Sequence, residues 1–464
     1  MVFFIWSLSI LGLGLDPRNR MNVLEIEYGA LAAHLAIIAF VLVGIRMPAA
    51  LAFSFMTHKA FAWAPVFGLI GYAQVLLCLQ FLAVVWLSFA ALRKGGLGSL
   101  LAFVQRKEAI LLWVLGLIWL KILSDIIFGG LSMDRLDSLK TVPVLIFLPI
   151  LVIFLSFLSY PTERVIRDMF VGMIVFSTIC ILPALPGVIE GRRFMLAQQG
   201  RERLALWGLD TIQGGQFFCF LALGGLGLSL VSRIEVVGVK PFGWAVFVAG
   251  FLLLVLNATR QFLLSCVVGL MLSVVISFRR SVWIVFAAAA FFFFSGFVLF
   301  QGVREASASE RVSIDSLSGE VATSRGVIWT DAFAAGLARP LLGQGFRNFG
   351  NVVTTVSHLT DEVITSRDNA HGFYQDLWAE HGVVLGAIVM LASVWSFVRI
   401  VVLAERLKSS ALYLIVYLNA TLMFLCIFSG TVWSSLSPYV LAVTMLAALN
   451  ENAGSQTPAV SARA

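Results

Sequence analysis

Charged residues are scarce in this chain of 464 residues: only 12% are Asp, Glu, Lys or Arg, whereas 60% are hydrophobic. A soluble domain of this length covers its core with a charged exterior, so the composition excludes an ordinary soluble protein. The apolar runs are about twenty residues long and lack the strict alternation of a membrane β-barrel. We therefore expect an all-α polytopic membrane protein, in which lipid takes the place of the polar shell.

Cysteine is also rare and follows no motif. The five cysteines lie in apolar runs without CxxC spacing: Cys78, Cys180, Cys219, Cys266 and Cys426. We expect neither a disulfide framework nor a cysteine metal site, but buried thiols that pack as small hydrophobes. No nucleic-acid-binding module is recognisable. The first fifteen residues lack a basic region and a small-residue cleavage site, so we expect no cleaved signal peptide.

Twelve apolar segments are long enough to be membrane-spanning helices. They lie near 29–45, 65–92, 109–128, 142–160, 169–189, 212–232, 242–257, 259–278, 282–300, 382–403, 411–428 and 436–449. Segment 2–15 is short for a crossing, and both a thirteenth span and a half-inserted helix remain open for it.

Lys and Arg in the short connections predict the orientation, because these residues are enriched on the cytoplasmic side. Fourteen of them occupy alternate connections: Arg18, Arg20, Arg93, Lys94, Arg106, Lys107, Arg164, Arg167, Arg233, Lys240, Arg279, Arg280, Arg406 and Lys408. If that side is cytoplasmic, the polar run 301–381 lies outside, which in the inner membrane of a Gram-negative bacterium means the periplasm. The chain then divides into membrane helices (1–300), the large loop (301–381), further membrane helices (382–450) and a disordered cytoplasmic tail (451–464).

One expected outer connection, residues 190–211, breaks this rule with four arginines: Arg192, Arg193, Arg201 and Arg203. Tolerated loop charge, as in an amphipathic helix on the membrane surface, is one interpretation. The other is a surface that binds an anionic group, because the planar guanidinium makes bidentate phosphate contacts that Lys cannot match. The net charge of +7 suits anionic headgroups or an anionic substrate.

Two further features lie within expected spans. Lys121 and Asp125 are four residues apart, so they can pair on one helix face. Such a pair marks either a substrate or proton path or a self-neutralised pair near the interface, and we favour the second. Arg260 stands at the outer start of the span 259–278, where it either snorkels to the interface or points a cation into an outward-facing cavity.

The polar run from Gln301 to His381 contains three of the five histidines, six arginines and no lysine. The alanine-rich stretch 326–338 within it favours a helix. The glycine-punctuated turn LLGQGFRNFG follows, and NAHGFYQDLWAEHG leads directly into the next span. Most groups able to carry chemistry are therefore concentrated in this run.

These segments resemble the O-antigen ligase and O-antigen polymerase superfamily over roughly residues 255–390. In that family an Arg starts the loop helix, a P-L-x-G-x-G-x-x-x-F turn follows, and a histidine precedes the next span. Arg325, residues 340–349 and His371 occupy the matching positions. Arg260 matches an Arg at the outer start of an earlier helix.

Two details distinguish the branches of this superfamily. Arg203 and Arg325 each begin an R-x10-G element, ending at Gly214 and Gly336, which is similar to paired elements of the polymerase branch. Gly372 stands directly after the histidine, where the ligase branch usually has Asn, Ser or Gln.

The resemblance implies a transferase that acts on glycans carried by undecaprenyl pyrophosphate, without a metal ion, nucleotide sugar or other cofactor. It implies that arginines bind the pyrophosphate leaving group, while a histidine takes the proton from the acceptor hydroxyl in an inverting attack at the anomeric carbon. His371 is the expected base, and Arg203, Arg260 and Arg325 are the expected pyrophosphate ligands. Additional candidates are Arg192, Arg193, Arg201 and Arg347.

The residue types suit this chemistry independently. Arginine stabilises a departing pyrophosphate, and histidine titrates near neutrality. By residue type alone His358 and His381 rival His371, and each is equally well explained as a structural histidine. Three carboxylates could orient the base or form a solvated face: Asp368, Asp376 and Glu380. No cluster has the spacing of a metal site.

Three functions remain open. The first is a ligase that transfers a finished glycan to lipid A–core or another acceptor. The second is a polymerase that joins repeat units on the same carrier. The third is a transporter or flippase of lipid-linked sugars, which the lack of internal repeats and of helix breaks at mid-membrane disfavours. The expected partners are the lipid-linked glycan donor, a glycan or lipid A–core acceptor and membrane lipid.

Overall fold

The computed structural model describes residues 23–61, 65–66, 70–93, 110–128, 148–182, 195–198, 201–204, 211–231, 239–257, 259–278, 326–345, 355–356, 363–364 and 373–428. These residues form two compact units, which we call unit 1 and unit 2. Unit 1 holds most of the helices before residue 278. Unit 2 holds the helix at 110–128 and the helices after residue 325.

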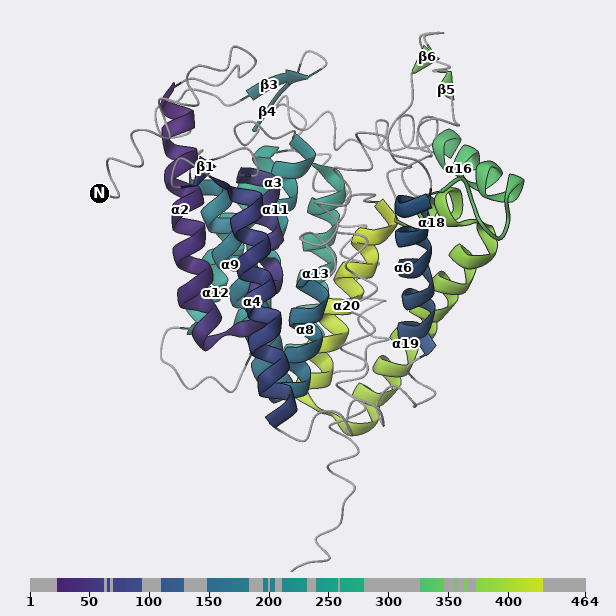
Figure 1. Cartoon of the computed structure of the whole chain (residues 1–464). Coiled ribbons are helices and arrows are strands. Elements are labelled where there is room, and N and C mark those ends of the chain that lie inside the picture. The colour runs from purple at the N-terminus through teal and green to yellow at the C-terminus, as the bar shows by residue number, and fades with distance from the viewer. Residues whose placement is uncertain are drawn as a thin grey trace, which may run out of the picture. The chain divides into compact units, whose positions relative to one another are not determined.

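Unit 1 contains seven long helices among its described residues, and each coincides with a predicted span (Figure 1). They are α2 (Val23–Arg46), α4 (Tyr72–Arg93), α8 (Leu148–Ser159), α9 (Thr162–Ile181), α11 (Thr211–Leu230), α12 (Val239–Asn257) and α13 (Arg260–Phe278). α9 begins seven residues earlier than predicted, at Thr162 rather than near residue 169. Its first turns contain Glu163, Arg164 and Arg167, and hydropathy does not recognise such polar turns as part of a helix.

α11 is the central helix of unit 1, since it packs along both α9 and α12. Glycines permit the close approach to α12: a Cβ on Gly225 would lie 2.7 Å from the carbonyl oxygen of Gly243, and one on Gly250 would lie 2.7 Å from the amide nitrogen of Ala222. Small residues bring helix backbones together in membranes, where packing contacts replace the hydrophobic effect as the source of association.

The described cysteines are free thiols. Cys180, Cys219 and Cys266 are buried, as the sequence predicts. The Sγ atoms of Cys219 and Cys266 lie 3.9 Å apart between α11 and α13. Cys78 differs because it is exposed on α4, among other exposed apolar side chains of that helix.

An unpredicted segment connects α2 to α4. It consists of a 3-10 helix, η1 (Pro48–Ser54), and a short α-helix, α3 (Phe55–Phe61). All residues of η1 are buried. The segment runs along α9, where Gly172 abuts the backbone of Ala50 and the Ser177 hydroxyl lies 3.6 Å from Met56 Sδ. With a rise of about 2.0 Å per residue in a 3-10 helix and about 1.5 Å in an α-helix, η1 and α3 together extend about 25 Å, which is most of a hydrocarbon core.

This segment crosses unit 1 from one end to the other. At its start, the Arg46 carbonyl accepts a hydrogen bond of 2.9 Å from Arg164 Nη2 in the first turn of α9. At its end, the Tyr72 hydroxyl donates a hydrogen bond of 2.7 Å to Thr57 Oγ1, and α4 starts there. α4 then runs back, since Gln80 Nε2 donates to Ser54 Oγ at 2.9 Å.

The extra crossing corrects the predicted orientation. α2 and α4 end at the same end of unit 1, where α9 begins, so α2 starts at the opposite end. The start of α2 at Val23 therefore lies at the opposite end of unit 1 from Arg93, whereas the predicted spans place both on one side; Arg18 and Arg20 themselves lie outside the described residues. The hydropathy pattern missed the crossing because Ser54, Thr57, His58 and Lys59 interrupt a segment of only fourteen residues, seven in each helix.

Three short antiparallel hairpins accompany the helices. They are β1 with β2 (Pro65–Val66 and Ile70–Gly71), β3 with β4 (Met195–Gln198 and Arg201–Leu204), and β5 with β6 (Thr355–Val356 and Val363–Ile364). The first occupies the beginning of the span predicted at 65–92. The second replaces the amphipathic helix considered for 190–211, because Gln198 pairs with Arg201 and leaves only two residues, the second of them Gly200, for a tight connection.

Unit 2 contains five helices among its described residues: α6 (Ile110–Phe128), α16 (Gly326–Ala338), α18 (Phe373–His381), α19 (Val383–Leu407) and α20 (Ser410–Phe428). α19 packs against α6, α18 and α20, while α16 packs against α18. α6, α19 and α20 coincide with predicted spans, and α16 with the predicted loop helix. The segment after His371 leads into the span as predicted, and the structure adds that it forms a separate helix, α18, which Gly382 divides from α19.

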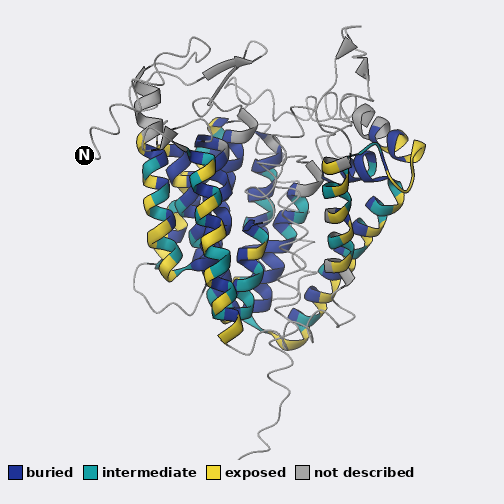
Figure 2. Ribbon diagram, viewed as in Figure 1, coloured by how far each residue is buried: buried dark blue, intermediate teal, exposed yellow. Residues whose placement is uncertain are grey.

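The structure confirms the helical class in the described residues, apart from the hairpins. By length and composition, α4, α12 and α19 can each cross a membrane. Their exposed residues include large apolar ones, such as Trp86 on α4 and Leu391 on α19, which are 64% and 65% exposed. Figure 2 shows exposed residues along α4 and α19. The spans predicted at 282–300 and 436–449, and segment 2–15, lie outside the described residues, so the total of twelve stays a prediction.

Candidate functional site

The structure describes only some of the predicted site residues. Arg260 is the first residue of α13, and Arg201 and Arg203 lie in β4. For these three the structure describes the backbone and not the side chain. The others lie outside the described residues: Arg192, Arg193, Arg325, Arg347 and His371, as does the rival His358. The structure does describe the segments that hold several of them.

The junction before Arg260 is a compact polar turn. Asn257 and Thr259 are buried, and the Thr259 hydroxyl donates a hydrogen bond to Asn257 Oδ1. The amide of Leu263 donates to the Thr259 carbonyl at 3.1 Å, so Thr259 is the N-cap residue of α13. On α11, Gly215 makes room for the junction, because a Cβ there would collide with both polar side chains. The backbone of Arg260 is thereby fixed against the beginning of α11.

The first R-x10-G element connects to the same region of unit 1. Arg203 lies in β4, which contacts α11 and α12, and Gly214 is a buried residue in the first turn of α11. β4 lies at the end of unit 1 where α11 begins (Figure 1). Unit 1 therefore brings the backbones of Arg203 and Arg260 to the same end of α11.

In unit 2, the turn after α16 caps the C-terminus of α18. The amide of Gln344 donates a hydrogen bond of 2.9 Å to the carbonyl of Ala379. The amide of Gly345 donates one of 3.0 Å to the carbonyl of Glu380. The last carbonyls of a helix lack partners within that helix, so this turn supplies donors that would otherwise have to come from water or side chains.

Glycine is required on both sides of this contact. Gly343 has φ 62° and Gly382 has φ 90°, a backbone region in which side chains with a Cβ are strained. A Cβ on Gly343 would also lie 2.5 Å from the amide nitrogen of Gly382, and one on Gly382 would lie 2.7 Å from the carbonyl carbon of Pro340. The glycine-punctuated turn thus has a structural cause: two backbones touch at the break between α18 and α19.

α16 is held against α18 by a third close approach. A Cβ on Gly336 would collide with the carbonyl of Trp378, and the rings of Phe333 and Trp378 meet edge to face with centroids 5.7 Å apart. The side chain of Gln344 adds a hydrogen bond of 2.8 Å from Nε2 to the carbonyl of Ala335. Gly336, which ends the second R-x10-G element, therefore serves helix packing.

This framework adjoins two predicted site residues in the sequence. α16 starts directly after Arg325, as predicted, and α18 starts two residues after His371. Phe373 and Tyr374, in the first turn of α18, are buried. The helices that follow Arg325 and His371 in the sequence, α16 and α18, are therefore packed together within unit 2.

The rival His381 is a structural histidine. It is 2% exposed, and its Nε2 lies 3.9 Å from Glu380 Oε2. Its Nδ1 has no hydrogen-bond partner within the part of the chain that the structure describes. Burial lowers the pKa of His381 to about 3, and the Lys121 cation contributes to the same direction. A side chain with this pKa stays neutral and accepts protons weakly at neutral pH, which does not suit a general base.

Lys121 and Asp125 form the ion pair that their spacing predicts. Lys121 Nζ donates to Asp125 Oδ2 at 2.6 Å on α6, and the side chains are 14% and 24% exposed. Gly345 of the turn lies beside this pair, since a Cβ there would be 3.9 Å from Asp125 Oδ2. The pair thus lies where α6 meets the turn and the end of α18.

No group of three His, Cys, Asp or Glu side chains that could hold a metal ion occurs among the residues that the structure describes.

These helices and their lipid-exposed faces define a membrane protein. Residues 245–391 match the family model described as O-antigen ligase (Wzy_C), which confirms the resemblance to the O-antigen ligase and polymerase superfamily. The matched region begins within α12 and ends within α19, so it includes the start of α13 and the whole contact of α16, the turn and α18. The comparison with curated proteins finds no match.

Proposed function

We propose that this protein is a glycosyltransferase of the inner membrane that transfers a glycan from undecaprenyl pyrophosphate to an acceptor such as lipid A–core. The observation that carries the proposal is the family match over 245–391, which covers Arg260, Arg325 and His371 in one segment. The loop 301–381 faces the periplasm in this proposal, because the basic connections at Arg93, Arg164 and Arg406 mark the other side as cytoplasmic.

In the proposed reaction the acceptor hydroxyl attacks the anomeric carbon with inversion. The new bond forms between the acceptor oxygen and that carbon, while the bond from the carbon to the pyrophosphate oxygen breaks. His371 takes the hydroxyl proton, and Arg203, Arg260 and Arg325 bind the departing pyrophosphate through charge-assisted hydrogen bonds. The additional candidates Arg192, Arg193, Arg201 and Arg347 would strengthen binding of the anion. No metal ion takes part.

A repeat-unit polymerase on the same carrier is the second candidate. Two observations favour it: the paired R-x10-G elements that begin at Arg203 and Arg325, and the glycine at 372 after the histidine. The chemistry and the roles of the residues are unchanged, because only the acceptor differs.

Substitution of His371 tests the proposal. We expect His371→Ala to abolish transfer while the protein remains in the membrane at normal abundance, because the attacking hydroxyl loses its base. Polymerised glycan that accumulates on the lipid carrier without reaching the acceptor would identify a ligase, and single repeat units would identify a polymerase. The matched control is His358→Ala, which removes another histidine of the same loop. Unchanged surface glycan in the His371 variant would refute the catalytic role.

Arginine geometry is tested separately. We expect Arg260→Lys and Arg325→Lys to lose most of the transfer activity, because an ammonium group cannot make the bidentate contact of a guanidinium. Arg339→Lys is the control, since Arg339 is an exposed residue of the turn with no assigned contact to the donor. Full activity in the first two variants would show that charge alone suffices. Activity that persists in EDTA would support independence from metal.

A further inference from the structure

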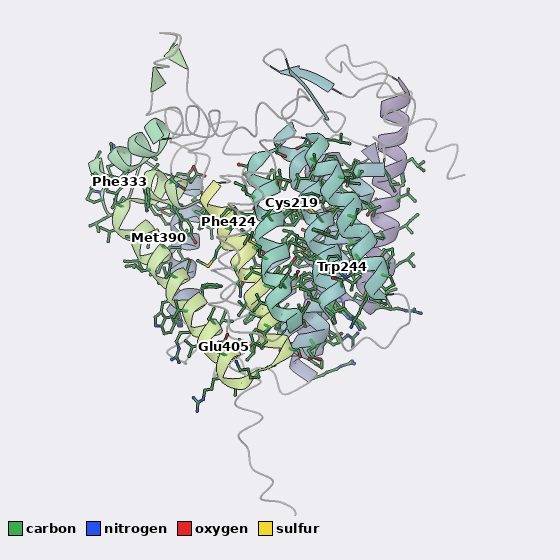
Figure 3. All side chains as sticks on the ribbon, turned by 180° about the vertical axis from the view of Figure 1, so that it is seen from behind. Cys219, Trp244, Phe333, Met390, Glu405 and Phe424 are labelled. Atoms are coloured by element: carbon green, nitrogen blue, oxygen red, sulfur yellow. The ribbon has the colours of Figure 1, made fainter. Side chains whose placement is uncertain are left out.

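In the part of α16 whose side chains the structure describes, the face that packs on α18 is made of small residues, and the two large apolar residues are exposed. Ala332 and Ala335 are buried, and Gly336 lies against the Trp378 carbonyl. On the other side of the helix, Phe333 and Leu337 are 41% and 53% exposed, and Phe333 is visible on α16 in Figure 3. A helix on the surface of a soluble domain has the reverse arrangement, with its large apolar residues facing the core.

The exposed apolar surface continues into the turn. Leu341 and Leu342 are 70% and 69% exposed, higher than either residue of α16. We call Phe333, Leu337, Leu341 and Leu342 the α16 patch. Among the described residues, the other exposed large apolar side chains all lie on helices that coincide with predicted spans. The α16 patch therefore has the surface chemistry of the lipid-facing helices although it belongs to the polar run 301–381.

The position of the patch relative to a membrane-spanning helix is fixed by hydrogen bonds. The Pro340 carbonyl accepts a hydrogen bond of 3.1 Å from the amide of Val384, in the first turn of α19. α19 has 25 residues and a mean hydropathy of 2.3, which suffices for a crossing. Its exposed residues begin at once, with Val384 and Ile388 each 43% exposed. The patch thus lies beside the first turns of α19, where a membrane crossing by that helix would begin.

We propose that the α16 patch inserts into the membrane and packs against lipid acyl chains just below the headgroups, at the end of the membrane where α19 begins. Arg339 lies between Leu337 and Leu341 and is exposed. A guanidinium on a long aliphatic stem reaches anionic headgroups while its neighbours remain among acyl chains. The turn and α16 are then an interfacial anchor, which holds the segments adjoining Arg325 and His371 at the membrane surface. This inference does not depend on which glycan is transferred.

Depth-dependent quenching tests the anchor in the full chain. A fluorescent amino acid replaces Leu342, and the protein is placed in nanodiscs of phosphatidylethanolamine and phosphatidylglycerol. One set of nanodiscs contains lipid with a doxyl quencher near the headgroup end of the acyl chain, and iodide serves as the aqueous quencher. Leu391, which is 65% exposed on α19, gives the lipid reference, and Arg406, exposed in its last turn, gives the aqueous reference. The same substitution at Leu337 repeats the test at a site outside the turn.

We expect positions 342 and 337 to lose as much fluorescence to doxyl lipid as position 391 does, and to be protected from iodide. Quenching by iodide as strong as at position 406, without quenching by doxyl lipid, would overturn the proposal. Protection from iodide that appears only after addition of a polyprenyl phosphate would assign the patch to the lipid tail of a substrate instead. Protection that appears only when two copies share a nanodisc would assign it to a dimer interface. Either of these last two results also overturns the lipid anchor.

Discussion

The carbonyl of Pro340 accepts a hydrogen bond of 3.1 Å from the amide of Val384, and this bond joins the polar run to the first turn of a membrane-spanning helix. An amide in the first turn of a helix has no partner within that helix, so the turn satisfies a donor that would otherwise be unpaired near the membrane. The same turn satisfies carbonyls at the end of α18 through Gln344 and Gly345. The turn that resembles the O-antigen ligase motif therefore caps two helix ends, the C-terminus of α18 and the N-terminus of α19.

The glycines of this contact are predicted to be essential for folding. We expect Gly343→Ala to lower the unfolding free energy by roughly 2 kcal/mol or more, because φ 62° is strained for alanine and its Cβ would collide with the Glu380 carbonyl. Thermal unfolding in detergent measures this effect. Gly116→Ala on α6 is the control, since no atom of the described residues lies within 4 Å of a Cβ there, and it is expected to gain up to about 1 kcal/mol from helix propensity. Equal stability of the two variants would contradict the prediction.

The extra crossing by η1 and α3 is predicted to set which residues share a side of the membrane. Arg46 and Arg93 end α2 and α4, so cysteines introduced at both positions should react alike with a membrane-impermeant maleimide on intact cells. A cysteine at Gln74, exposed in the first turn of α4, should show the opposite reactivity. The background protein carries serine at Cys78, which is exposed. Opposite labelling of positions 46 and 93 would restore the topology expected from hydropathy.

Acid is predicted to destabilise unit 2 through His381. Its pKa is about 3 in the folded protein and 6.5 in its ordinary state, so the unfolded chain binds more protons between these values. The contribution to stability is complete above pH 6.5 and is lost progressively as the pH falls towards 3. The groups facing the imidazole are Glu380, with Oε2 3.9 Å away, and the Lys121 cation paired with Asp125.

Unfolding measured from pH 7.5 to 4.5 tests this prediction, with His381→Gln as the variant that cannot titrate. We expect the variant to be less dependent on pH than the unaltered protein. The control His358→Gln should keep the original dependence, since the prediction concerns His381 alone. An acid profile that His381→Gln leaves unchanged would assign the titration to other groups.

Lys121 and Asp125 are predicted to depend on each other. We expect Lys121→Met or Asp125→Asn alone to destabilise the protein more than the double substitution does, because each single change leaves a partly buried charge without its partner. The coupling energy in a double-mutant cycle should lie between about 0.5 and 3 kcal/mol. Additive effects would show that the 2.6 Å contact contributes little to stability.

The predictions that succeeded depend on signals that are local in the sequence. The helices of the predicted spans follow from long, mainly apolar runs such as 110–128 and 260–278, and the ion pair of Lys121 and Asp125 follows from helical periodicity. The start of α16 directly after Arg325 matched the family pattern. The hydropathy pattern failed to predict the buried segment between α2 and α4, because that segment is buried by its packing against other helices. Pro48–Phe61 is buried by α2, α8 and α9 rather than by its own composition, and its polar Ser54 and Thr57 have partners on α4.

For this protein the sequence by itself determined the helical membrane class and the resemblance to the O-antigen ligase and polymerase superfamily, because both depend on composition and short motifs. It also selected Arg203, Arg260, Arg325 and His371 as site residues, a selection that remains a prediction. Only the tertiary structure explains why glycine is required at positions 343 and 382. Gly343 and Gly382 come from separate segments, and their shared need for a missing Cβ exists only once the turn lies on the break between α18 and α19. Contacts of that kind join residues distant in sequence, which a local pattern does not record.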